Sequence, residues 1–152
     1  MLLSLVVFLT AAGPVEEKKS LAPNFKLKDL DQISVELSAF KNKSPVVLFF
    51  WTTWCPYCRT ALKDLTRIIP DLEKAGVAVL PINSGEPAVK VARFANNNGY
   101  TFRIFLDIDS QVSDDYHIYG VPVYFLVDKY GYVCLVSNAF PLEEVRKLAK
   151  EK

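Results

Sequence analysis

The sequence predicts an α/β sandwich with a mixed central sheet and a β-hairpin at its N-terminal side. Three observations carry this prediction. Two apolar runs, at residues 46–51 and 77–82, have the length of buried strands, and residues at helical spacing separate them. Buried strands that alternate with helices are typical of parallel sheets. A final pair of strands, joined by a short turn, adds antiparallel pairing to the sheet.

The first 13 residues form an apolar run that ends in the small residues Ala11, Ala12 and Gly13. The run is too short to span a bilayer, which takes about 20 residues, but it has the length of the apolar part of a signal peptide. It contains no Lys or Arg, and the alternative is an apolar N-terminal strand. We predict an export signal over residues 1–13, a solvated linker over 14–20 and one folded domain over 21–152.

The predicted elements of the domain follow in order. Alternating apolar and polar residues predict a hairpin from strands 24–28 and 33–37, and the continuous apolar run predicts the central strand at 45–51. After Cys58, apolar residues recur every three or four positions, which predicts a helix that ends near Gly76. A strand at 77–82, a helix from 88 that stops at Gly99, a strand at 102–106 and a short helix at 110–117 come next. Strands 123–127 and 132–136 and a helix at 142–149 complete the domain.

Composition excludes several classes of function. The net charge is +1 and no basic stripe or Gly-rich phosphate loop occurs, so we expect no nucleic-acid partner. Three cysteines and one histidine are too few for a disulfide framework or for a tetrahedral zinc site without a carboxylate ligand. We therefore expect no metal and no cofactor beyond a redox-active disulfide.

Cys55 and Cys58 stand two residues apart between the central strand and the following helix. This spacing places Cys55 at the N-cap and Pro56 at the first helical position, where the missing amide hydrogen costs nothing. Helix-end dipoles and the nearby Arg59 favour a thiolate there, and thiols in such sites have pKa values of roughly 3.5–7.5. We predict thiol–disulfide exchange with Cys55 as the attacking thiolate and Cys58 as the resolving thiol. The alternatives are a static disulfide or two adjacent core thiols.

The order of strand, Trp54-Cys55-Pro56-Tyr57-Cys58, helix and a later Gly120-Val121-Pro122 before a strand resembles the thioredoxin superfamily. The segment 37–43, an additional strand–helix segment at 83–107 and the predicted export signal are similar to the TlpA/ResA-like branch of the AhpC/TSA-type redoxins. The resemblance covers about residues 21–150. It implies a thioredoxin-like three-layer α/β/α sandwich.

The same resemblance implies where a substrate binds. A cis Val121–Pro122 bond beside the cysteines would leave the Val121 backbone free to pair with an extended substrate segment. Trp54 and Tyr57 offer flat apolar surface next to the sulfurs. Together with Pro56 they complete the predicted substrate-binding set. The alternatives are an ordinary trans proline and a Tyr57 that is plain helix surface.

Two departures from the resemblance concern proton transfer. Thioredoxin has a buried Asp six residues before the first cysteine, where this chain has Phe49. The TlpA/ResA-like branch often has a Glu three residues after the second cysteine, where this chain has Ala61. Glu86 is a candidate proton shuttle for Cys58, and the alternative is a carboxylate that caps the following helix. Cys134 lies in a predicted strand, and we expect it to be buried and inert.

The predicted function is a thiol–disulfide oxidoreductase, monomeric and located in the periplasm or elsewhere outside the cytoplasm. We expect it to reduce a partner protein, although the Pro-Tyr pair between the cysteines leaves the redox direction open. The resemblance implies roles such as the reduction of apocytochrome cysteines in cytochrome c maturation, with a membrane thiol–disulfide electron donor upstream.

Two other classes of function stay open. Thr52 lies three residues before Cys55, as in peroxiredoxins, although their Pro four residues earlier is Leu48 here. The first alternative is therefore a thiol peroxidase. The second is a non-catalytic copper-binding or chaperone module, because thiolates are soft ligands that suit Cu(I).

Overall fold

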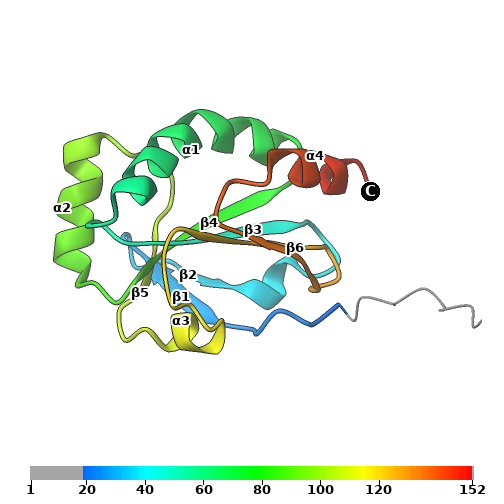
Figure 1. The fold of residues 1–152 in the computed structure, drawn as a ribbon, viewed down its shortest axis with the longest axis horizontal. Coiled ribbons are helices and arrows are strands. Elements are labelled where there is room, and N and C mark those ends of the chain that lie inside the picture. The colour runs from blue at the N-terminus through cyan, green and yellow to red at the C-terminus, as the bar shows by residue number, and fades with distance from the viewer. Residues whose placement is uncertain (1–18, 152) are drawn as a thin grey trace, which may run out of the picture.

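A computed structural model describes residues 19–151 of the chain. The predicted signal over 1–13 and most of the predicted linker therefore lie outside the described residues. Seven strands form one mixed sheet in the order β2-β1-β5-β4-β3-β6-β7 (Figure 1). The strands are β1 (Lys26–Asp29), β2 (Ser34–Glu36), β3 (Val46–Trp51), β4 (Ala78–Ser84), β5 (Phe105–Asp107), β6 (Val123–Val127) and β7 (Val133–Ser137).

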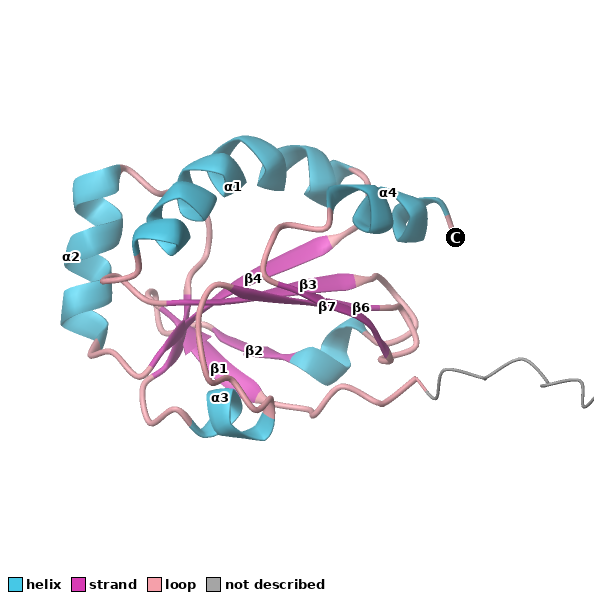
Figure 2. Ribbon diagram, viewed as in Figure 1, coloured by secondary structure: helices cyan, strands magenta, loops and turns pink. Residues whose placement is uncertain are grey.

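Four α-helices and one short 3-10 helix connect the strands. They are η1 (Leu37–Phe40), α1 (Pro56–Lys74), α2 (Ala88–Asn98), α3 (Gln111–Asp115) and α4 (Leu142–Lys150). In Figure 2, α1 and α4 lie on one side of the sheet and α3 and η1 on the other, while α2 covers the end near the start of α1. This arrangement is the predicted three-layer sandwich.

The centre of the sheet is β3, whose six residues are all buried. β3 pairs parallel with β4, in a register that joins Trp51 to Asn83. It pairs antiparallel with β6 on its other side, where Phe49 lies opposite Tyr124. A strand buried on both faces is expected to be continuously apolar, and this explains why the run at 46–51 was readable from the sequence. Because β3 and β4 are parallel neighbours, the loops that follow them meet at one edge of the sheet.

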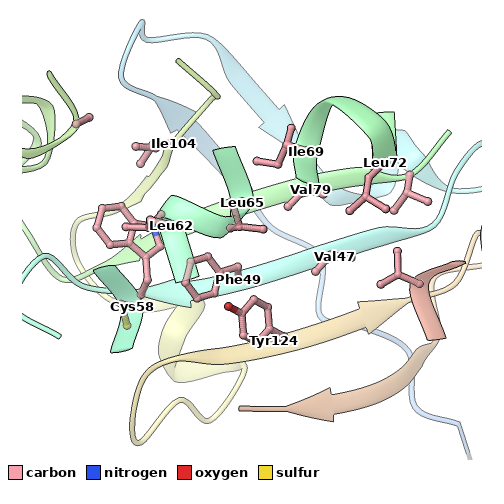
Figure 3. Close-up of a cluster of buried hydrophobic side chains, with 14 of the residues drawn as sticks. Val47, Phe49, Cys58, Leu62, Leu65, Ile69, Leu72, Val79, Ile104 and Tyr124 are labelled. Carbon is pink, nitrogen blue, oxygen red and sulfur yellow. The ribbon is translucent and has the colours of Figure 1, made fainter. Parts of the chain in front are cut away.

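Two apolar cores lie on the two faces of the sheet. The larger core joins alternate residues of β3 to the inner faces of α1, α2 and α4, and Figure 3 shows part of it, with Cys58 at one end and Leu72 toward the other. The second core packs the opposite side chains of β3, including Phe50, against the hairpin and α3. The start of α1 therefore places both active-site candidate thiols, Cys55 and Cys58, in the larger core.

Several observed boundaries differ from the predicted ones by a few residues. β5 begins at Phe105 rather than at residue 102, because Phe102 packs on the ring of Tyr100 instead of joining a strand. α3 covers only residues 111–115 of the predicted 110–117. The predicted stop of α2 is confirmed, since Gly99 has a φ of 66° and closes the helix in the left-handed region. Within residues 19–151, no helix combines the length and apolar character needed to cross a bilayer.

Candidate active site

Both cysteines lie at the point where β3 ends and α1 begins. Cys55 is the N-cap of α1, with extended backbone angles, and Pro56 takes the first helical position. The Cys55 sulfur accepts a hydrogen bond from the Cys58 amide at 3.2 Å. The predicted helix-start geometry is therefore present, because an orphan amide of the first turn points at the Cys55 Sγ.

The two sulfurs have different surroundings. Both cysteines are free thiols; Cys55 keeps 3% of its surface exposed and Cys58 keeps none. Burial, strengthened by the hydrogen bond with the neighbouring Cys55, raises the pKa of the Cys58 thiol to about 12. Cys58 therefore stays protonated at neutral pH and is poorly suited to attack first.

Cys55 is more buried than its place at a helix start led us to expect. One reason is the loop before β6, which contacts the sulfur through Val121. The Cys55 thiol donates to the Val121 carbonyl at an Sγ–O distance of 3.6 Å. Val121 precedes a cis peptide bond to Pro122, as predicted. The structure thus brings residues 55 and 121 together across 66 positions of sequence.

Three exposed aromatic side chains belong to the segments around Cys55. Trp54 is 64% exposed and Tyr57 is 78% exposed, which agrees with the surface predicted for them. Sequence reasoning missed Tyr119, which is 95% exposed and lies two residues before Val121. Its position just ahead of the Val-Pro pair was the signal that could have identified it.

A mainly apolar groove begins beside the cysteines and follows α1. Its volume is about 480 Å³, and its walls include Tyr57 and Pro122 from the predicted set. Sequence reasoning missed three further lining residues, Tyr124, Asn138 and Phe140. The Asn138 side-chain amide donates to the Pro122 carbonyl at 2.9 Å. These residues come from β6 and from the loop before α4, whose placement over α1 the sequence alone does not reveal.

Glu86 lies in the loop between β4 and α2, and it does not cap α2, because that helix has no side-chain cap. The capping alternative is therefore wrong. The carboxylate is buried, and its partners are Thr53, Asn83 and Lys90. Burial alone would raise the pKa of Glu86, but the hydrogen bonds from these partners outweigh it and hold the pKa below its ordinary value. The described structure records no hydrogen bond from Glu86 to either thiol.

The positions of the two usual proton acceptors are both apolar. Phe49 is fully buried and stacks on Tyr124, with ring centroids 4.5 Å apart; Figure 3 shows the two rings together near Cys58. Ala61 lines the groove beside α1. Any base for Cys58 must therefore come from elsewhere, in this chain or in its substrate.

Cys134 lies in β7, as predicted, but it is half-buried rather than buried. β7 is the last strand of the described sheet, and residues 20–22 pair beside its start. Burial raises the pKa of this thiol above its ordinary value. Experiments that trap Cys55 therefore need a control for this third thiol.

Known proteins share this arrangement and much of this sequence. The sequence model of the AhpC/TSA family matches residues 19–136. The chain is 40% identical to the thiol-disulfide oxidoreductase ResA of Geobacillus kaustophilus, over 84% of this chain and 74% of that protein. It is 36% identical to ResA of Bacillus subtilis, over 82% of this chain and 69% of that protein.

The fold is also found among solved structures. The thioredoxin domain of a thiol-disulfide oxidoreductase from Bacteroides vulgatus superposes with a TM-score of 0.76 at 23% identity, over 87% of this chain and 97% of that domain. This likeness confirms the predicted thioredoxin-like fold. The chain belongs to the AhpC/TSA family and, within it, to the ResA-like thiol-disulfide oxidoreductases.

Proposed function

We propose that the protein reduces disulfides of partner proteins outside the cytoplasm, with Cys55 as the attacking thiol and Cys58 as the resolving thiol. One observation carries the assignment of roles. The Cys55 sulfur accepts the Cys58 amide at the start of α1, whereas Cys58 is fully buried and its pKa is raised to about 12. Cys55 keeps 3% of its surface exposed and Cys58 keeps none, which supports Cys55 as the sulfur that meets the substrate first.

The reaction has two steps. The Cys55 thiolate attacks one sulfur of the substrate disulfide, which forms a mixed disulfide and releases the other substrate sulfur as a thiolate. Cys58 then loses its proton and attacks the Cys55 sulfur, which releases the second substrate sulfur and leaves a Cys55–Cys58 disulfide. Two electrons pass to the substrate. Positions 49 and 61 carry no acid or base, and we propose that the thiolate released in the first step takes the Cys58 proton.

The surface around the sulfur suits an extended segment of the substrate. The Val121 carbonyl already contacts the Cys55 thiol, and a substrate cysteine that replaces this contact brings its own backbone beside Val121. Trp54, Tyr57 and Tyr119 add exposed aromatic surface. We therefore favour substrates in which an apolar residue flanks the cysteine.

The proposed location and pathway draw on the N-terminal sequence and on the relatives. The apolar run over residues 1–13 has the length of a signal-peptide core, and ResA-like relatives support a role with cysteine pairs of other proteins. We propose that the substrate is an apocytochrome whose cysteines must be reduced before haem attachment. A membrane thiol–disulfide donor would then return the two electrons to the Cys55–Cys58 disulfide.

The experiment that tests this function is a Cys58→Ser trap expressed in the native host, in a Cys134→Ala background. Without a resolving thiol, the mixed disulfide on Cys55 should persist and its partner can be named by mass spectrometry after non-reducing electrophoresis. The matched control adds Cys55→Ser and should trap nothing. Recovery of apocytochromes supports the pathway, and recovery of other cysteine-pair proteins supports only the oxidoreductase.

Two outcomes would contradict the proposed oxidoreductase function. If the trap yields no adduct while the wild-type protein removes peroxide without any disulfide partner, the protein is a peroxidase and the proposal is wrong. If the reduced protein binds Cu(I) and does not reduce insulin or a model disulfide, it is a binding module instead.

A further inference from the structure

Thr53, two residues before Cys55, is held by side chains at every backbone polar group. Its amide donates to Glu86 Oε2 at 2.7 Å and its hydroxyl donates to Glu86 Oε1 at 2.7 Å. Its carbonyl accepts from Arg59 Nε at 2.8 Å. Thr53 is itself buried, and its two bonds to Glu86 are buried as well, so these two are shielded from water and are stronger than surface bonds would be.

Glu86 is fixed in turn from its own side. Asn83 donates its side-chain amide to Oε2 at 2.8 Å, and the Lys90 ammonium lies 2.7 Å from Oε1. Each carboxylate oxygen therefore has two partners, and the pKa held below its ordinary value keeps the group ionised at neutral pH. A carboxylate saturated in this way is a rigid acceptor and a poor carrier of protons.

The topology of the sheet explains why two residues 33 positions apart meet. β3 and β4 are parallel neighbours, and Trp51 is in register with Asn83. Thr53 therefore follows β3, and Glu86 follows β4, at the same edge. The Glu86 carboxylate therefore links the loop between β3 and α1, which carries Cys55, to the loop between β4 and α2.

We propose that Glu86 is a positioning residue for the Cys55 thiol, acting through Thr53, and does not shuttle protons to Cys58. This inference rests on the proposed function, in which Cys55 attacks. Only Trp54 separates Thr53 from Cys55 in the sequence. The Cys55 sulfur must keep its 3.2 Å bond from the Cys58 amide while it faces Val121. A shift of about 1 Å at a reacting group can lower a rate by about a hundredfold.

Two substitutions of Glu86 separate positioning from proton transfer. Glu86→Ala should slow alkylation of Cys55 and reduction of a model disulfide by about tenfold or more, since Thr53 loses two of its three hydrogen bonds. Glu86→Gln should stay within about threefold of wild type, because an amide oxygen can accept the Thr53 and Asn83 amides while its NH2 donates to the Thr53 hydroxyl. A proton shuttle requires the opposite result, with Glu86→Gln as slow as Glu86→Ala.

Substitutions of Thr53 test the same contact from its other side, and the conservative serine variant is their control. Thr53→Val removes only the hydroxyl bond, Thr53→Ser keeps it, and the serine variant should retain the wild-type rate. In a double-mutant cycle, adding Thr53→Val to Glu86→Ala should lower the rate of Cys55 alkylation little further, because both substitutions remove the same contact. The pH profile of Cys55 alkylation should move in Glu86→Ala, which a purely structural role would not cause.

Two outcomes overturn the inference. One is a Glu86→Ala variant with a lower melting temperature but an unchanged Cys55 rate and pH profile. The other is a cycle in which the two substitutions are fully additive. Failure of the proposed function looks different, since wild-type protein would then show no exchange dependent on Cys55.

Discussion

The two sides of the Cys55 sulfur are built in opposite ways. On the side of β3, Thr53 donates two buried hydrogen bonds to Glu86 and accepts a partly buried one from Arg59. On the side of the loop before β6, Val121 contacts the sulfur, Tyr119 is 95% exposed, and the bond that holds the Pro122 carbonyl comes from an exposed Asn138. Buried charge-assisted bonds resist water and salt better than exposed ones. The comparison indicates that the chemistry is fixed on one side and that partners are accommodated on the other.

The largest expected effect comes from removing the Cys55 sulfur, which lies between the two sides. Cys55→Ser should lower reduction of insulin or a model disulfide to the background rate, because no other described thiol has a helix-start position. Cys134→Ser, on the edge strand β7, is the matched control and should retain full activity. If activity survives Cys55→Ser but not Cys134→Ser, Cys55 is not the reacting sulfur and the two sides described here do not surround the reaction.

A second prediction concerns the buried thiol and pH. The folded-state pKa of Cys58 is raised to about 12, above the ordinary value of about 8.5 in the unfolded chain. The native state therefore binds the proton more tightly, so its contribution to stability is complete below pH 8.5 and is lost as pH rises toward 12. Reduced wild type should lose about 1–2 kcal/mol more unfolding free energy between pH 8 and pH 10 than Cys58→Ala. The unfolding free energies come from denaturant titrations at each pH. If wild type and Cys58→Ala lose the same unfolding free energy between pH 8 and pH 10, Cys58 is not held neutral by the fold.

A third prediction sharpens the description of the fixed side. Arg59→Leu removes the donor to the Thr53 carbonyl and should slow Cys55 alkylation by about threefold to tenfold, less than Glu86→Ala because one bond of three is lost. Arg67→Leu is the control, since Arg67 is exposed on the same helix and pairs with Asp64. Stopped-flow alkylation checks both. A loss larger in Arg67→Leu than in Arg59→Leu would assign the effect to helix charge rather than to the Thr53 contact.

The smallest predicted effect lies on the open side. Tyr119→Ala should raise KM for a protein disulfide by about twofold to fivefold and leave kcat and the reduction of a small disulfide unchanged, because only contacts outside the reacting atoms are lost. Tyr130→Ala, an exposed tyrosine in the turn after β6, should change neither. If Tyr119→Ala slows the small disulfide equally, the loop is part of the chemistry and the two sides are not distinct.

Much of the fold and part of the site could be predicted from the sequence because local patterns carry them. The continuous apolar run at β3 and the cysteine spacing at α1 each reflect one element and its immediate neighbour. The contact of Glu86 with Thr53 could not be predicted, since it depends on which strands are neighbours in the sheet. The burial of Cys55 was missed for the same reason, because the loop that covers it arrives from 66 residues away.

The most direct test of the central claim is a competition for alkylation between the two reduced thiols at pH 7. Both thiols lie on the tryptic peptide 44–59, so fragment-ion mass spectrometry of this peptide after a brief exposure to iodoacetamide would measure modification at Cys55 and at Cys58 separately. We predict that Cys55 is modified first, by about a hundredfold or more, because the neighbouring buried thiol stays protonated at that pH. Equal modification, or Cys58 modified first, would contradict the assignment of attacking and resolving roles.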